Sequence, residues 1–102
     1  MLLDLFLAAE DFNVYCINKD SGYVRWEFIS GFPVKKAPRI IGKDVYLFPQ
    51  RGGLFCLSTF SGKQKWWRPG LTGFLAATRT QLLATDRIGN VVVLSRKDGA
   101  AY

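Results

Sequence analysis

The chain has 102 residues, of which 49% are apolar and 15% aromatic, with a formal net charge of +6 and no histidine. This length allows one small domain, and the apolar content excludes a disordered segment. The lack of histidine removes the commonest general base and a common metal ligand, which disfavours an enzyme from the start. The basic residues are spread along the chain without a dense run, which favours solvated surface charge over a nucleic-acid-binding site.

The first element is the apolar run at 5–8. The opening sequence MLLDLFLAAED resembles a secretion signal only superficially, because it has no positive start and Asp4 interrupts an apolar run too short to cross a membrane. We therefore predict a β-strand here. We expect no membrane insertion, and no signal is visible.

Three segments of the chain align without a gap, at 5–22, 45–62 and 82–99, in steps of 40 and 37 residues. Each segment has an apolar run, a polar turn with Gly or Asn, a second apolar run and a polar loop that ends in Gly. A glycine at the end of such a loop supplies the positive φ that a type I turn with a bulge requires. These glycines are Gly22, Gly62 and Gly99.

Another strand follows each loop, and in the first two copies it carries a tryptophan four residues after the glycine. These tryptophans are Trp26 and Trp66. The stretches between copies have room for one more short strand, roughly at 34–41 and 73–78. Four antiparallel strands in about 40 residues are typical of a β-propeller blade. A β-sandwich or meander is the alternative architecture.

The sequence therefore predicts an all-β fold: a partial β-propeller with about two and a half to three blades, each a four-stranded antiparallel sheet. Residues 1–102 form one repeat segment, with a partial first blade at about 1–30, a second at about 33–69 and a partial third at about 72–102. Such a set cannot close a ring. We expect a segment of a larger propeller, or a chain completed by a partner or by copies of itself.

The sequence RGGLFCLSTFSGKQKW at 51–66 resembles the pyrroloquinoline-quinone-like (PQQ-like) β-propeller repeat family. That family has an acidic-Gly turn, an apolar run ending in Leu, a Thr-Gly-Lys loop and a Trp, and Ser61 stands here in place of the Thr. The first copy departs further, because Asn13 replaces the turn glycine and Tyr23 replaces the lysine. The third copy, IGNVVVLSRKDGAAY, matches as far as Gly99.

The resemblance implies that the repeated tryptophans dock between neighbouring blades. The residues agree, since Trp26 and Trp66 recur at the same position of an outer strand whose face the next sheet must cover. Trp67 points to the opposite face from Trp66, so both core packing and surface binding stay open for it.

The two cysteines, Cys16 and Cys56, occupy the same column in consecutive copies. Packed sheets stand about 10 Å apart, whereas a disulfide needs Cα atoms closer than about 7 Å. We therefore predict two free, buried thiols. Neither cysteine has the neighbours that a metal site would need.

The function that we predict is a non-catalytic structural or protein-interaction scaffold. Its motif residues, Gly22, Trp26, Gly62, Trp66 and Gly99, are structural, and we expect no catalytic, cofactor-binding or metal-binding residues. Many PQQ-like propellers are of this kind, including outer-membrane assembly lipoproteins. The resemblance therefore implies a protein partner and a location in the periplasm or cell envelope.

The alternative function is a fragment of a PQQ-dependent quinoprotein dehydrogenase. By resemblance, such enzymes hold PQQ and Ca²⁺ on the propeller axis, with acidic and Asn ligands and an adjacent Cys-Cys disulfide. Cys16 and Cys56 are not adjacent, and the acidic residues fall mainly at turns or strand starts, where hydrogen bonds to backbone explain them. Nucleic-acid binding is a third reading, through KQKWWRPG, but Trp66 is already assigned to the core and we expect no nucleic-acid partner.

Overall fold

The computed structural model describes residues 5–34 and 36–102, and within them every regular element is a β-strand. The strands are β1 (Leu5–Glu10), β2 (Asn13–Asn18), β3 (Val24–Ile29), β4 (Arg39–Ile41), β5 (Asp44–Leu47), β6 (Leu54–Ser58), β7 (Gln64–Arg68), β8 (Leu71–Ala77), β9 (Gln81–Asp86) and β10 (Val91–Ser95). The all-β prediction is confirmed. In the part of the chain so described, no helix is long and apolar enough to cross a membrane. Residues 1–4, which the prediction includes in the first blade, lie outside the described residues.

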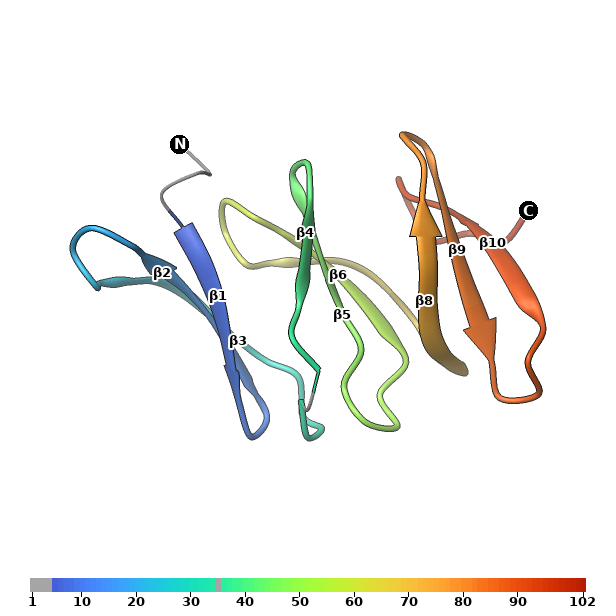
Figure 1. Ribbon diagram of the computed structural model, residues 1–102, viewed down its shortest axis with the longest axis horizontal. Helices are drawn as coiled ribbons and strands as arrows, with labels where there is room; N and C mark the ends of the chain where they lie inside the picture. The colour runs from blue at the N-terminus through green and yellow to red at the C-terminus, as the bar shows by residue number, and fades with distance from the viewer. Residues whose placement is uncertain (1–4, 35) are drawn as a thin grey trace.

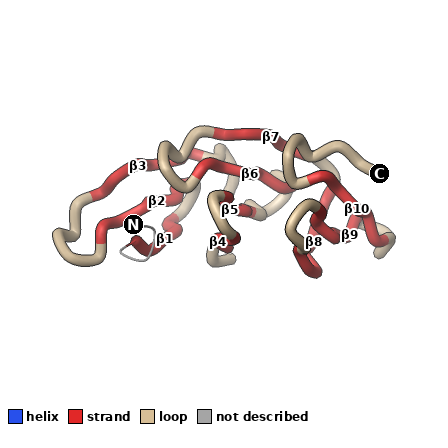
Figure 2. Tube along the Cα trace, turned by 90° about the horizontal axis from the view of Figure 1, so that it is seen from above, coloured by secondary structure: helices blue, strands red, loops and turns tan. Residues whose placement is uncertain are grey.

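The strands form three antiparallel sheets that follow one another along the chain. The first sheet is β1-β2-β3, the second β4-β5-β6-β7 and the third β8-β9-β10. Figure 1 shows them side by side along the long axis of the molecule. In Figure 2, β3 and β7 lie along one long edge, while β1, β4 and β8 lie along the opposite edge. Each sheet therefore runs from one edge of the molecule to the other.

The second sheet is buried on both faces. Its central strands β5 and β6 are buried continuously, whereas β2 and β9 in the flanking sheets alternate between buried and half-buried residues. A strand covered on both faces needs an unbroken apolar run, and a strand covered on one face needs only every second residue. The apolar runs VYL and LFCL of the middle copy meet this requirement.

Two hydrophobic cores follow from this arrangement, one on each face of the second sheet. The first core contains Val14, Cys16, Trp26, Val34, Val45, Leu47, Phe55 and Leu57. The second core contains Tyr46, Leu54, Cys56, Trp66, Leu71, Leu82, Ala84 and Leu94. Adjacent residues of β5 and β6 therefore enter opposite cores, as the pleat of a strand requires.

The strands between the repeats differ in length from their predicted ranges. The strand expected at 34–41 is only β4, Arg39–Ile41, because Val34 packs in the first core and Pro38 has no amide for a sheet hydrogen bond. The strand expected at 73–78 is β8, which begins earlier, at Leu71. It does so because only Pro69 and Gly70 separate it from β7.

Leu57→Ala tests the first core. Leu57 has no exposed surface, so we expect the truncation to lower the free energy of unfolding by about 2–5 kcal/mol. Urea unfolding followed by tryptophan fluorescence measures the change. Ile88→Ala is the control, because that side chain is 83% exposed. Equal losses in the two variants would contradict the packing described here.

Candidate functional site

The two repeated tryptophans each reach from one sheet to the next. Trp26 on β3 donates a hydrogen bond from Nε1 to the carbonyl of Thr59 at 2.8 Å, and Trp66 on β7 donates to the carbonyl of Arg96 at 2.9 Å. Both indoles are buried, with 8% and 7% of their surface exposed. A buried indole has one polar atom to satisfy, and here the loop of the following sheet satisfies it.

The glycine that ends each of these loops lies under the indole. A Cβ atom on Gly62 would collide with the ring of Trp26, and one on Gly99 would collide with Trp66. Gly22 has a similar φ of 76°, yet a Cβ there would meet nothing within 4 Å. Four of the five predicted motif residues therefore pair across consecutive copies, tryptophan of one copy with glycine of the next, and Gly22 has no indole against it.

Trp67 lies on the opposite face of β7 from Trp66 and is 45% exposed. Its ring packs on Phe55 with the ring centroids 6.0 Å apart, and its Nε1 donates to the carbonyl of Gly52 at 2.6 Å. The indole of Trp67 therefore packs on the neighbouring strand of its own sheet while part of it stays exposed, and a role in surface binding stays a prediction.

Cys16 and Cys56 are free, buried thiols, which confirms the prediction. They belong to different cores, on opposite faces of the second sheet. Burial raises the pKa of Cys56 to about 12, and burial also raises the pKa of Cys16. A thiol is nucleophilic as the thiolate, so neither side chain is activated at neutral pH.

Sequence reasoning missed a polar cluster around Asp44, a buried residue at the start of β5. The Asp44 carboxylate accepts Lys65 Nζ at 2.6 Å and an Arg96 guanidinium nitrogen at 3.2 Å. The Tyr46 hydroxyl donates to Asp44 at 3.0 Å and accepts Arg96 Nε at 2.9 Å. We expected acidic residues at strand starts to bond to backbone, whereas Asp44 instead accepts three side-chain donors.

Arg96 makes this cluster a link between sheets. Its guanidinium also donates to the carbonyl of Thr78 at 2.8 Å and to the carbonyl of Ile41 at 3.0 Å. These acceptors come from the third and second sheets. With its charge matched by arginine and lysine, the Asp44 carboxylate is a structural element here rather than a free base. The signal in the sequence was weak, since Asp44 and Arg96 come from different repeats.

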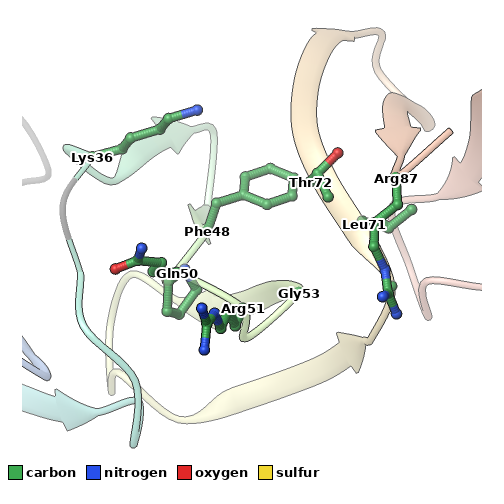
Figure 3. A pocket seen from close by; sticks show the side chains of 10 residues that line it. Lys36, Phe48, Gln50, Arg51, Gly53, Leu71, Thr72 and Arg87 are labelled. Atoms are coloured by element: carbon green, nitrogen blue, oxygen red, sulfur yellow. The ribbon is translucent and has the colours of Figure 1, made fainter. Parts of the chain in front are cut away.

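A cavity of about 670 Å³ lies between the second and third sheets. This volume is within the range of about 300–1,000 Å³ that small-ligand sites occupy. The cavity is lined by Lys36, Phe48, Pro49, Gln50, Arg51, Gly53, Gly70, Leu71, Thr72 and Arg87. Figure 3 shows the ring of Phe48 extending towards Thr72, with the cationic side chains around the rim.

The charges of this interblade cavity, as we call it, all have one sign. Lys36, Arg51 and Arg87 are exposed, and none of the described residues that line the cavity is acidic. Phe48 and Leu71 are among the apolar residues that line it. The interblade cavity therefore offers positive potential around an apolar floor, which favours an anionic group with an apolar part. None of the motif residues predicted from the sequence lies in it.

Three consecutive antiparallel sheets, each packed against the next through an indole on a glycine, form a β-propeller segment. No family model matches the chain, and no curated protein matches it by sequence. Among solved structures, the chain is similar to BamB from Moraxella catarrhalis, with a TM-score of 0.81 and 18% identity over 96% of this chain and 33% of that chain.

The chain is also similar to the quinohemoprotein alcohol dehydrogenase from Comamonas testosteroni, with a TM-score of 0.72 and 16% identity over 96% of this chain and 19% of that chain. Both neighbours are β-propellers, so the partial-propeller prediction is confirmed. The chain spans about a third of BamB and about a fifth of the dehydrogenase. At these identities the likeness is one of fold, and it supports the resemblance to PQQ-like propellers at that level.

Gly62→Ala and Gly22→Ala separate the indole contact from the backbone conformation. The two glycines have φ values of 71° and 76°, so both variants incur a similar backbone cost of about 1–2 kcal/mol. Only at Gly62 does the new methyl group collide with Trp26, so we expect Gly62→Ala to lose about a further 1–3 kcal/mol of stability. Guanidinium-chloride unfolding of both variants measures the difference. Equal losses would mean that the indole does not depend on the glycine.

Alkaline pH tests the burial of Cys56. Its pKa rises from 9.0 to about 12 in the folded state, so its contribution to stability is complete below pH 9 and is lost as the pH rises towards 12. We expect Cys56→Ala to lose less stability than the wild type between about pH 8 and about pH 11. Some loss remains in the variant, because burial also raises the pKa of Tyr46. The urea midpoints of the wild type and of Cys56→Ala across this pH range measure the difference. Identical pH profiles would contradict the burial of the Cys56 thiol.

Proposed function

We propose that the chain is a non-catalytic segment of a larger β-propeller that serves as a protein-interaction scaffold. The observation that carries the proposal is the contrast between the second sheet, covered on both faces, and the flanking sheets, covered on one. Val24 and Ile29 of the first sheet are 54% and 66% exposed, and Val91 of the third sheet is 56% exposed. Apolar side chains on a sheet face favour cover by another sheet.

The glycine of the first repeat supports the same proposal. Gly62 and Gly99 are buried under indoles, whereas Gly22 is exposed. The polar turn around Gly22 nevertheless has the same hydrogen bond as the other two, from the Gly22 amide to the Asn18 carbonyl at 2.8 Å. In our proposal an indole from a neighbouring blade covers Gly22, supplied by the remaining blades of a larger propeller or by another copy of this chain.

We also propose a protein partner and a location in the periplasm or cell envelope. The support is the resemblance of the repeats to PQQ-like propellers together with the similarity in fold to BamB. The similarity to a quinohemoprotein alcohol dehydrogenase supports the dehydrogenase alternative through the fold only. Among residues 5–34 and 36–102, no group of three or more Cys, Asp or Glu that could hold a metal ion supports that alternative further.

Light scattering on the purified chain tests the proposed incompleteness of the sheet stack. We expect a mass above the 11.5 kDa of one chain, rising with concentration, because the apolar outer faces associate. The double variant Val24→Glu/Val91→Glu should shift the mass towards the monomer. The control Ser21→Glu/Thr80→Glu adds the same charge at exposed loop positions. It should leave the mass unchanged.

Two results would contradict the proposed function. A dispersed monomer at every concentration would mean that the outer faces need no cover. A change in the absorption spectrum of PQQ on titration with the chain and Ca²⁺ would favour the dehydrogenase alternative instead.

A further inference from the structure

We propose that the interblade cavity binds a short acidic segment of a partner protein, with an apolar side chain of that segment on the cavity floor. This inference rests on the proposed scaffold function and deepens it, because it names the chemistry of the partner. It is drawn from a comparison of the two junctions between sheets within this one chain.

At the first junction, the chain itself fills the space between the sheets. Residues 30–34 of the β3–β4 link pass between the β1–β2 turn of the first sheet and the β5–β6 turn of the second. The Val34 amide donates to the Asp11 carbonyl at 2.6 Å, and the Gln50 amide donates to the Pro33 carbonyl at 2.7 Å. The ring of Phe32 lies against Gly52. A short peptide segment with an aromatic and an aliphatic side chain therefore occupies this junction.

At the second junction, the corresponding link is too short to do this. Pro69 and Gly70 alone connect β7 to β8. Proline followed by a glycine with a φ of 83° fits the two central positions of a type II turn, which reverses the chain within two residues. The space between the β5–β6 turn and the β9–β10 turn is therefore left open, and it is the interblade cavity.

The walls of the open junction correspond to those of the filled one. In the repeat alignment Arg51 takes the place of Asp11, and both residues have a positive φ, 64° and 53°. Arg87 likewise takes the place of Gln50. Among residues 5–34 and 36–102, no backbone hydrogen bond outside the strands uses the Arg51 carbonyl or the Arg87 amide. These are the two groups whose counterparts bind the peptide at the first junction.

The charges define what this segment must carry. The first wall has the acidic Asp11 where the second wall has Arg51, and Lys36 and Arg87 add two further cations at the cavity. Arginine binds carboxylates through two parallel hydrogen bonds, and arginine clusters are a common means of recognising acidic motifs. The half-buried ring of Phe48 provides the apolar floor. A nucleic-acid strand fits less well, because base stacking needs exposed aromatic rings along a basic track.

Fluorescence anisotropy with a designed peptide tests the inference. The probe is fluorescein-Glu-Gly-Phe-Pro-Val-Asp, whose four central residues are those at 31–34 of the chain. We expect saturable binding that weakens as the salt concentration rises from about 50 to about 500 mM. The matched peptide with Gln and Asn in place of the acids should bind about tenfold more weakly or worse. A peptide with Ser in place of Phe should also bind more weakly.

Variants of the chain locate the binding site. Arg51→Gln/Arg87→Gln should weaken binding of the acidic peptide by about tenfold or more, because both residues line the cavity. Both residues are exposed, so we expect the double variant to fold. Lys63→Gln/Lys97→Gln removes the same charge from exposed positions outside the interblade cavity. It should leave the affinity within about twofold.

Three results would overturn the inference: no saturable binding of the acidic peptide, equal losses in the two double variants, or equal binding of the Phe and Ser peptides. Displacement of the peptide by a single-stranded oligo(dT) at lower concentration would assign the cavity to nucleic acid instead. Failure here is distinct from failure of the proposed function. Concentration-dependent association without peptide binding removes only the cavity proposal, whereas a dispersed monomer removes the scaffold proposal itself.

Discussion

The contact on which this structure depends is an indole lying on a glycine of the next sheet. A glycine leaves no Cβ between the ring and the backbone, so Trp26 comes close enough to donate its Nε1 proton to the loop of the second sheet. One side chain thereby fixes both the spacing of two sheets and the position of a loop. Trp66 does the same at the next junction, and the two contacts together give the three sheets a common geometry.

Apart from the hydrophobic cores, the two junctions share this contact and differ in the rest of their interactions. The first is completed by the chain segment at 30–34, which packs between two hairpin turns. The second is held by the polar cluster in which Arg96 joins Asp44 to carbonyl groups of both sheets. An arginine that spans two sheets stabilises the outer part of the junction without filling its inner part. The short Pro69–Gly70 link then leaves that inner part open, and the interblade cavity results.

Local patterns in the sequence predicted the parts of the structure that are themselves local. The repeat period, the loop glycines and the apolar runs of β5 and β6 are each set by neighbouring residues, so a reading of the chain was enough for them. The pairing of Asp44 with Arg96 was missed because it joins different repeats. The cavity was missed because it depends on the difference in length between the β3–β4 and β7–β8 links. The repeat pattern indicated only that each stretch between copies had room for one more strand.

Departures from the repeat mark the positions where this chain differs from a purely structural stack. The tryptophan and glycine positions recur because every junction needs them, and they give the fold without distinguishing one junction from another. Arg51 and Arg87 follow no such requirement, since the aligned residues Asp11 and Gln50 occupy the same turns with a negative charge or none. A charge that changes sign between equivalent turns is not needed to build the sheet stack. Its place beside an open cavity is therefore better explained by recognition of a negatively charged partner than by stability.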